Sequence, residues 1–309
     1  MLCVGSVSSD EAGIKIYAEK SEYFVGELIR GNVEIEVHKP LKHNGISVAC
    51  NCLDHVKWKV HTGTALRVCA YQNALFSQEY VLVPKGELGV GTFNFPVMWQ
   101  LDPTHPATFQ YSSSCLGIVK YTIKSQIKMP GIFTSNIINE VNILVKPCPE
   151  PIRPVIAAQS IQASTCCSTT GVVGVYAMLS KETYAPDEYI TFFIDFDTLG
   201  LKSDIKSVSV RLTQCLIFRK SRQNLQKRFI KRKCLDQQSF GRVKKDFKER
   251  LQVSLKVPQD VAECPSIDTD ILECKYYIKV ELAFALCITN SFKMNLKIAP
   301  PPIAGIPVA

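Results

Sequence analysis

The sequence predicts an all-β fold of two tandem antiparallel β-sandwiches of the immunoglobulin-like kind, and three observations carry this prediction. Apolar and polar residues alternate over many short segments, which Gly, Pro, Asn and Asp separate at intervals of about 8 to 12 residues. No long segment has the 3.6-residue periodicity and end caps of a helix. The chain also repeats its own pattern, which indicates two copies of one domain.

The repeat is clearest in one strand of each half. Apolar and polar side chains alternate within residues 119–127, which is typical of a half-buried strand. The core of this strand, Lys-Tyr-x-Ile-Lys at 120–124, recurs at 275–279 in the same phase. A second pair of segments, 23–29 and 184–190, shares Tyr, Glu and Ile in register. Because the two pairs keep their order and approximate spacing, we interpret the chain as a duplicated domain.

The remaining elements follow from the same alternation. In the first half, strands are predicted at 14–18, 29–37, 46–52, 119–127 and 141–145. Residues 93–95 lead into a segment with Pro96 and Pro103, which limits it to a sheet edge or a strand end. In the second half, strands are predicted at 173–179, 190–196, 208–217, 251–257, 274–286 and 294–298.

A proline-rich segment separates the two halves. Residues 146–154 contain four prolines, which cannot donate regularly to a sheet, so the segment is predicted to be a short stiff connector. We therefore predict a sandwich at 1–147, a Pro-rich linker at 148–165, a second sandwich at 166–299 and a short tail at 300–309. A prior of roughly 150 residues per domain also gives two domains for 309 residues.

The composition is that of an ordinary globular protein, with 46% hydrophobic and 21% charged residues. The first ten residues lack the basic and apolar regions of a signal peptide, and no apolar run reaches 18 residues. These features predict a cytosolic protein. The 13 cysteines are an odd number, which favours free thiols over a disulfide framework.

The positive charge is concentrated in one stretch. Residues 219–250 contain 13 Lys or Arg and three Asp or Glu, a net charge of +10, whereas the whole chain has a net charge of +8. Three interpretations compete. The stretch could be a solvated strand pair with its connecting loop. It could bind anionic lipid headgroups or phosphorylated tails. It could also serve nucleic acid binding or nuclear import.

We favour no nucleic acid partner, because only Phe229, Phe240 and Phe247 are available for stacking on bases. For the anionic lipid or phosphate interpretation, the candidate binding residues are Lys227, Arg228, Lys231, Arg232, Lys233, Lys244 and Lys245. The partner implied by that interpretation is an anionic membrane surface or a phosphorylated segment.

We assign no catalytic, cofactor-binding or metal-binding residue. Cys52 and His55 have the residue types of a nucleophilic pair, and Cys50 adds a further zinc ligand type, but no second ligand pair follows at a finger-like interval. A core thiol beside a loop histidine explains the same residues. Cys166 and Cys167 are adjacent at the start of the second domain and are candidates for lipidation by a palmitoyl chain.

Several motifs resemble the arrestin-domain-containing (α-arrestin) family. The first half contains Tyr-x-x-Gly-Glu-x-Ile at 23–29, Phe95-Pro96, Pro-Ala-Thr-Phe at 106–109 and Gly-Ile-Val-Lys-Tyr-Thr-Ile-Lys at 117–124. The second half adds Cys166-Cys167 before Gly171, Tyr-Ala-Pro-Asp-Glu at 184–188, and Pro265-Ser266 before Lys-Tyr-Tyr-Ile at 275–278. The motifs follow the family order over nearly the whole chain.

The resemblance implies an arrestin-like fold and a non-enzymatic cytosolic adaptor without a cofactor. Such an adaptor binds cytoplasmic tails of membrane proteins and directs their trafficking, endocytosis or ubiquitination, often by recruiting HECT-type ubiquitin ligases. We therefore expect a cytoplasmic protein peripherally associated with the plasma membrane or endosomes.

The sequence also departs from the family pattern. It contains no Pro-x-Tyr, so HECT-type ligases are expected as partners only indirectly, and it contains no acidic Leu-rich clathrin-box segment. The alternative function is a coat or retrieval-complex subunit that resembles the arrestin-like retromer component. A Cys-dependent enzyme is a third, less favoured hypothesis.

Overall fold

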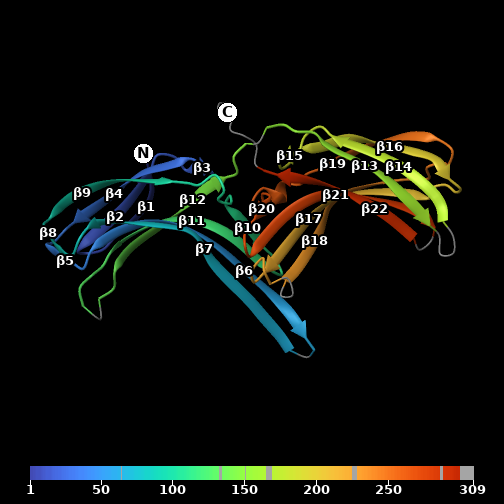
Figure 1. The fold of residues 1–309 in the computed structure, drawn as a ribbon. Helices are drawn as coiled ribbons and strands as arrows, with labels where there is room; N and C mark the ends of the chain where they lie inside the picture. The colour runs from blue at the N-terminus through green and yellow to red at the C-terminus, as the bar shows by residue number, and fades with distance from the viewer. Residues whose placement is uncertain are drawn as a thin grey trace. The chain divides into compact units, whose positions relative to one another are not determined.

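The computed structural model describes residues 1–63, 65–131, 134–149, 151–164, 169–224, 228–285 and 288–299. The chain forms two compact units, which we call the first and the second unit. The first contains Met1–Cys148 with Lys220–Arg222, and the second contains Pro149–Arg219 and the chain from Gln223 onward. Each unit is built from mainly antiparallel sheets, with one short parallel pairing in each six-stranded sheet, so the predicted all-β fold of two sandwiches is confirmed (Figure 1).

The first unit contains one four-stranded and one six-stranded sheet. The four-stranded sheet has the order β1-β2-β4-β9, with strands β1 (Leu2–Ser8), β2 (Ala12–Ala18), β4 (Leu28–Val37) and β9 (Gly91–Gln100). The six-stranded sheet has the order β3-β12-β11-β6-β7, and β10 pairs with β11. Its strands are β3 (Glu22–Phe24), β6 (Ile46–Thr62), β7 (Ala65–Val83), β10 (Phe109–Ser112), β11 (Leu116–Ile127) and β12 (Ile137–Lys146). A small separate sheet pairs β5 (Leu41–His43) with β8 (Gly86–Leu88).

The second unit repeats the strand order of the two larger sheets, while β5 and β8 have no counterpart among its described strands. Its four-stranded sheet has the order β13-β14-β16-β19, with β13 (Val155–Ser164), β14 (Thr169–Leu179), β16 (Tyr189–Leu201) and β19 (Lys248–Lys256). Its six-stranded sheet has the order β15-β22-β21-β17-β18, and β20 pairs with β21. Its strands are β15 (Thr183–Tyr184), β17 (Ser207–Arg219), β18 (Arg228–Phe240), β20 (Ile267–Asp268), β21 (Leu272–Ala285) and β22 (Ile288–Ile298). A short 3₁₀ helix, η1 (Gln259–Val261), precedes β20.

The repeated turn motif has the same geometry in both units. Gly26 has φ 84° and Asp187 has φ 66°, so both lie in the left-handed region at equivalent positions. The glutamate that follows closes each turn: Glu27 accepts from the Phe24 amide and Glu188 accepts from the Ala185 amide, both at 2.9 Å. The shared glutamate is therefore explained by a turn hydrogen bond, and no binding role is needed for it.

The repeated tyrosine is a core residue in both units. Tyr121 and Tyr276 lie in β11 and β21 and are fully buried. The Tyr121 hydroxyl donates to the Pro106 carbonyl at 2.7 Å, and the Tyr276 hydroxyl donates to the Cys264 carbonyl at 2.6 Å. In each unit this bond ties the loop before the short strand to the centre of the six-stranded sheet. Burial raises the pKa of both phenols, so they stay neutral donors.

The structure adds strands that the sequence did not predict, among them β1 and β18, and two further differences are informative. Strand β13 occupies part of the range 148–165 that the sequence assigns to a linker; its run Ile-Ala-Ala at 156–158 lacks clear alternation, and the prolines before it dominate the pattern. The second difference is the long hairpin of β6 and β7, of which only 46–52 was expected as a strand. Both faces of β7 are partly exposed, so its sequence carries little periodicity.

We predict that Tyr276→Phe lowers the free energy of unfolding of the second unit by about 1–2 kcal/mol. The substitution removes the hydroxyl that donates to the Cys264 carbonyl and accepts from the buried Gln214 amide at 2.8 Å. Urea denaturation measures the change. The matched control is Tyr176→Phe, because the Tyr176 side chain is exposed and its hydroxyl has one hydrogen-bond partner among the described residues, the Met178 sulfur, so a change within about 0.5 kcal/mol is expected. Equal effects of the two substitutions would contradict a core role for Tyr276.

Candidate functional site

The basic stretch 219–250 runs from the end of β17 through β18 to the start of β19. Lys227 lies outside the described residues. Residues that pair across antiparallel strands share a sheet face. Arg232 pairs with Cys215, whereas Lys231 and Lys233 pair with Leu216 and Gln214, so the strand sends Arg228 and Arg232 to one face and the two lysines to the other. The predicted cluster is therefore divided between two surfaces.

Acidic residues from distant segments neutralise much of the stretch. Ion pairs join Lys233 to Asp260, Arg242 to Asp204, Lys245 to Asp246, Lys248 to Asp197, and Arg250 to Asp195. Only Asp246 among these acids belongs to the stretch itself. Among the described candidate residues, Arg228, Arg232 and Lys244 are exposed and have no ion pair. The local positive field is thus smaller than the charge count of the segment suggests.

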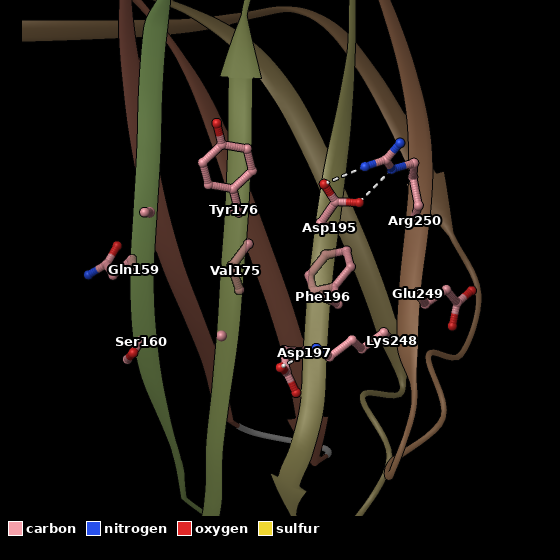
Figure 2. A pocket seen from close by; sticks show the side chains of 12 residues that line it. Gln159, Ser160, Val175, Tyr176, Asp195, Phe196, Asp197, Lys248, Glu249 and Arg250 are labelled. Carbon is pink, nitrogen blue, oxygen red and sulfur yellow. Dashed lines mark hydrogen bonds and ion pairs between the residues drawn. The ribbon is translucent and has the colours of Figure 1, made fainter.

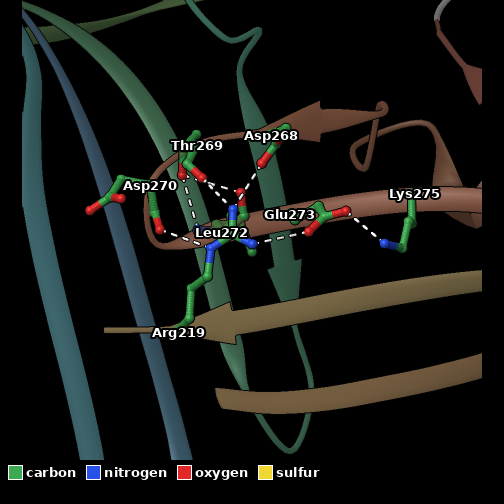
Figure 3. Close-up of polar contacts among 7 residues, drawn as sticks. All are labelled: Arg219, Asp268, Thr269, Asp270, Leu272, Glu273 and Lys275. Atoms are coloured by element: carbon green, nitrogen blue, oxygen red, sulfur yellow. Dashed lines mark hydrogen bonds and ion pairs between the residues drawn. The ribbon is translucent and has the colours of Figure 1, made fainter. Parts of the chain in front are cut away.

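Arg219, at the end of β17, is a structural residue. It is only 8% exposed, and its guanidinium donates to the carbonyls of Asp270 (2.9 Å) and Thr269 (2.8 Å) in the turn between β20 and β21 (Figure 3). It also pairs with Asp268 at 2.9 Å and Glu273 at 3.1 Å. With four acceptors around it, this arginine fixes the turn and adds no free charge to the surface.

The acid beside Arg219 has a shifted pKa. Burial alone would raise the pKa of Glu273, but a hydrogen bond from Lys275 at 2.8 Å and the charges of Lys275 and Arg219 outweigh burial, so the pKa is lowered. Figure 3 shows Glu273 between the two cations. Glu273 is therefore ionised at neutral pH and stabilises the folded second unit.

The outer face of the sheet β13-β14-β16-β19 has a different character. It presents Ile156 from β13, Tyr176 and Met178 from β14, and Tyr189 and Phe193 from β16, all exposed by at least 42%. Met178 pairs with both Ile156 and Phe193, so three of these side chains form one row across the sheet. We call these five residues the apolar patch.

Charged pairs border the apolar patch. Asp195 and Arg250 lie opposite each other on β16 and β19 and form a two-point ion pair at 2.6 and 3.0 Å (Figure 2). The Arg250 guanidinium also lies 5.4 Å from the centre of the Phe193 ring. Asp197 and Lys248 form the next pair along the same strands, at 3.6 Å. The charged border is balanced and carries no net charge of its own.

A hollow of about 550 Å³ lies beside this border. Figure 2 shows Tyr176, Asp195, Asp197 and Lys248 around it. Ala158, Ser160 and Gly174 line it from β13 and β14, and their small side chains leave the space open. The face thus combines exposed aromatic and aliphatic groups with a depression, which is typical of a surface that contacts another protein.

The equivalent face of the first unit is mainly polar, and its exposed apolar Met98 on β9 lies opposite Arg30 of β4. On β2 and β4, Lys15 bridges Glu34 at 3.0 Å and Glu36 at 3.3 Å. On β4 and β9, Asn32 donates to Asn94 at 2.8 Å. Because the two sheets have the same strand order, the fold does not require exposed apolar residues at this place. The apolar patch is therefore particular to the second unit. Sequence reasoning missed it because its residues are dispersed over three strands.

The hypothesised catalytic pair does not form. Cys52 is buried in β6, and burial raises its pKa to about 12. His55, three residues further along the same strand, points to the opposite face. Among the residues that the structure describes, no three His, Cys, Asp or Glu side chains gather as metal ligands would. Cys166 and Cys167, the lipidation candidates, lie outside the described residues.

In the described part of the chain, no helix has the length and apolar character needed to cross a bilayer.

Two family models match the chain. The family described as "Arrestin (or S-antigen), N-terminal domain" matches residues 13–147. The family described as "Arrestin (or S-antigen), C-terminal domain" matches residues 169–303. The two matched ranges fall in the two halves of the duplication, and together they leave only the N-terminal segment, the connection and the last residues unmatched.

Known relatives match over part of their length. The chain is 25% identical to Arrestin domain-containing protein 17 of Caenorhabditis elegans over 226 residues, which are 67% of this chain and 52% of the relative. It is 21% identical to Arrestin domain-containing protein 4 of Homo sapiens over 210 residues, which are 63% of this chain and 50% of the relative. The chain thus spans about half the length of the curated relatives that it matches.

We predict that Glu273→Gln makes the second unit less sensitive to acid. The folded-state pKa of Glu273 is lowered, so its contribution is complete above the unfolded-state pKa of about 4.3 and is lost as the pH falls through the folded-state value. Between pH 7 and pH 3, the wild type should lose more unfolding free energy than the variant. Urea denaturation at the two pH values measures this difference. Glu263→Gln, at an exposed position, is the control and should behave as the wild type.

Proposed function

Because the chain belongs to the arrestin family through both of its domains, we propose that it is a non-enzymatic adaptor that binds cytoplasmic parts of membrane proteins and directs their trafficking. Its site of action in this proposal is the cytoplasmic surface of the plasma membrane or of endosomes. Two surfaces support the proposal, and each has its own test.

The observation that carries the proposal is the apolar patch on the second unit. A sandwich buries its apolar residues between its sheets, so exposed rings on an outer face need a different explanation. Tyr189 and Phe193 are 60% and 46% exposed, and aromatic residues of this kind dominate the energetics of protein interfaces. A partner segment that covers them would gain the free energy of removing this apolar area from water.

The second surface would face the membrane. Arg228 and Arg232 lie on one face of β18, and Lys244 lies in the connection to β19. None of the three has an acidic partner in the described part of the chain. An anionic leaflet attracts each free basic residue near its surface by about 1 kcal/mol. In this proposal, the other members of the predicted cluster contribute less, because Lys233 and Lys245 already pair with Asp260 and Asp246.

Ubiquitination enters the proposal only indirectly. The sequence has no Pro-x-Tyr motif of the kind that WW domains of HECT-type ligases bind. A ligase would therefore be recruited through a second protein.

We predict that the double variant Tyr189→Ser, Phe193→Ser binds its membrane-protein partners at least about tenfold more weakly than the wild type, because two exposed rings are lost from the contact. The immobilised chain is incubated with detergent-solubilised membranes, and transmembrane proteins that it retains are identified and quantified. The matched control is Met98→Ser, which removes a 59% exposed apolar side chain from the outer face of the first unit. It should leave retention unchanged.

Two outcomes of this experiment are informative against the proposal. If the wild type retains no transmembrane protein above an unrelated β-sandwich, the adaptor function is wrong. If the double variant retains the same proteins as the wild type, the apolar patch is not the contact surface.

We predict salt-sensitive binding to anionic vesicles that depends on the unpaired basic residues. In co-sedimentation with phosphatidylserine vesicles, the triple variant Arg228→Ala, Arg232→Ala, Lys244→Ala should bind at least about tenfold more weakly than the wild type at low salt, since each residue contributes about 1 kcal/mol. Binding of the wild type should also fall at physiological salt.

The control triple variant removes the same net charge from ion-paired positions, Lys233→Ala, Arg242→Ala and Lys248→Ala. It should bind more tightly than the first variant. Equal, weak binding of the wild type and both variants would identify the basic stretch as a solvated surface.

A further inference from the structure

The two edge strands of the sheet β13-β14-β16-β19 differ in how many of their outward backbone groups are hydrogen-bonded to side chains of the second unit. An edge strand presents backbone N–H and C=O groups that another strand can pair with. On the β19 side, two of these groups are occupied: the Ser254 amide donates to the Gln238 side chain at 2.9 Å, and the Lys256 amide donates to Asp236 at 2.6 Å. Both acceptors come from β18. This edge is closed to a further strand.

On the β13 side, strand β22 of the other sheet lies nearby, and among the described residues only one side chain bonds to a backbone group of this edge. The Gln162 carbonyl accepts from the Asn290 side chain at 2.8 Å, so this carbonyl faces away from β14. In an antiparallel pair, the N–H and C=O of one residue point to the same side, and every second residue points outward. Ile156, Ala158 and Ser160 therefore also present their backbone groups to the free edge. No side chain of the described residues forms a hydrogen bond with the backbone of these three.

The sequence of β13 lacks the usual protection of such an edge. Proteins generally blunt exposed edges with charged residues, proline, bulges or short strands. Strand β13 has ten residues, none of them charged and none proline, and its one irregularity lies at its end, at Ala163/Ser164. By contrast, the edge strand β18 contains Arg228, Lys231, Arg232, Lys233 and Asp236.

The free edge borders the hollow described above. Ala158 and Ser160 point to the same face as Tyr176 and the apolar patch, and they line the hollow together with Gly174. A strand added beside β13 would lie about 4.8 Å from it and about 9.6 Å from β14. Only long side chains on such a strand reach over the small residues of β13 into the hollow. The charged residues nearby already pair with each other, Lys248 with Asp197 and Arg250 with Asp195. The added strand therefore does not need a charged side chain at this place.

We propose that the free edge of β13 accepts an extended segment of a partner protein as an additional strand, with long apolar side chains at every second position that cover Ala158 and Ser160 and fill the hollow. This inference rests on the proposed adaptor function and specifies the form of the segment that is bound. Backbone pairing supplies the orientation of the segment, and the hollow with the apolar patch supplies its selectivity.

The test uses a probe of defined chemistry and two variants at one position. The probe is a mixture of synthetic decapeptides with Leu, Ile or Phe at alternate positions, Ser, Thr or Gln between them, and two terminal lysines for solubility. Ser160→Pro removes the N–H that faces the free edge while the ladder to β14 stays intact, and proline is tolerated on such an edge. Ser160→Ala changes the side chain and keeps the N–H. The affinity of the peptides that bind the wild type should fall at least about tenfold in Ser160→Pro and stay within about twofold in Ser160→Ala.

Amide hydrogen exchange of the wild type provides a second readout that does not depend on a folded proline variant. On binding, protection should rise at Ala158 and Ser160, whereas the amides of Ala157 and Gln159 are already paired with β14 in the free protein. A bound peptide that leaves Ala158 and Ser160 unprotected, or that binds both variants equally, would overturn strand addition.

The outcomes also separate this inference from the proposed function. If no peptide of the mixture binds, strand addition at β13 is wrong. The adaptor function is judged independently by the retention of transmembrane proteins and its loss in the variant of Tyr189 and Phe193. The retention of transmembrane proteins could depend on Tyr189 and Phe193 while the amides of Ala158 and Ser160 stay unprotected. That result would assign the apolar patch to a partner that lies on the sheet face.

Discussion

Every open β-sheet ends in two strands whose outward backbone groups need partners, and this constraint organises the second unit. Strand β15 pairs only with Lys297 and Ile298, so the rest of β22 is also an edge of its sheet; this strand carries Lys293 and lies beside β13. Strand β18 carries five charged residues, and its side chains also cap the amides of β19. The edges at β18, β19 and β22 are thus charged or capped. The remaining edge, β13, has ten residues without a charge, and within the described ranges only its Gln162 carbonyl accepts from a side chain. Within the four-stranded sheet, side chains thus cap two amides of the β19 edge, whereas the β13 edge has neither charges nor proline.

The duplication separates what the fold needs from what the surface adds. Both units keep the same strand order, the same glutamate-closed turn and the same buried tyrosine that holds a loop carbonyl. These shared features stabilise the sandwich wherever it occurs. The outer faces of the two four-stranded sheets differ: ion pairs around Lys15 cover one, and exposed side chains such as Phe193 cover the other. Since the two sheets share one strand order, the fold itself does not account for the difference between their outer faces.

The sequence alone predicts the fold well, because alternation and the repeated Lys-Tyr-x-Ile-Lys core depend on neighbouring residues within one strand. It predicts the surfaces poorly, because these depend on residues that meet only after folding. The charge of the segment 219–250 is reduced by Asp195, Asp197, Asp204 and Asp260, none of which lies in the segment. The apolar patch likewise draws on three strands, and each contributes only one or two exposed rings or chains. The sequence did not predict strand β13, because the prolines before it dominate the local pattern and its central residues are small.

The pairing of charges has a consequence for the specificity of binding. A segment with a net charge of +10 would attract any anion at long range, but ion pairs with distant acids leave only a few basic groups, such as Arg228 and Arg232, to act on a partner. Attraction by so few charges falls steeply with salt and discriminates little between partners. Selectivity must then come from contacts at short range. On the second unit these are the rings of Tyr189 and Phe193, the hollow over Gly174 and the direction of the free backbone groups of β13, all of which lie on or beside one sheet face. In the proposed adaptor, weak electrostatic attraction to a surface and directional backbone pairing with a segment would therefore be complementary: the first would bring the molecule near its partner, and the second would select the segment that stays bound.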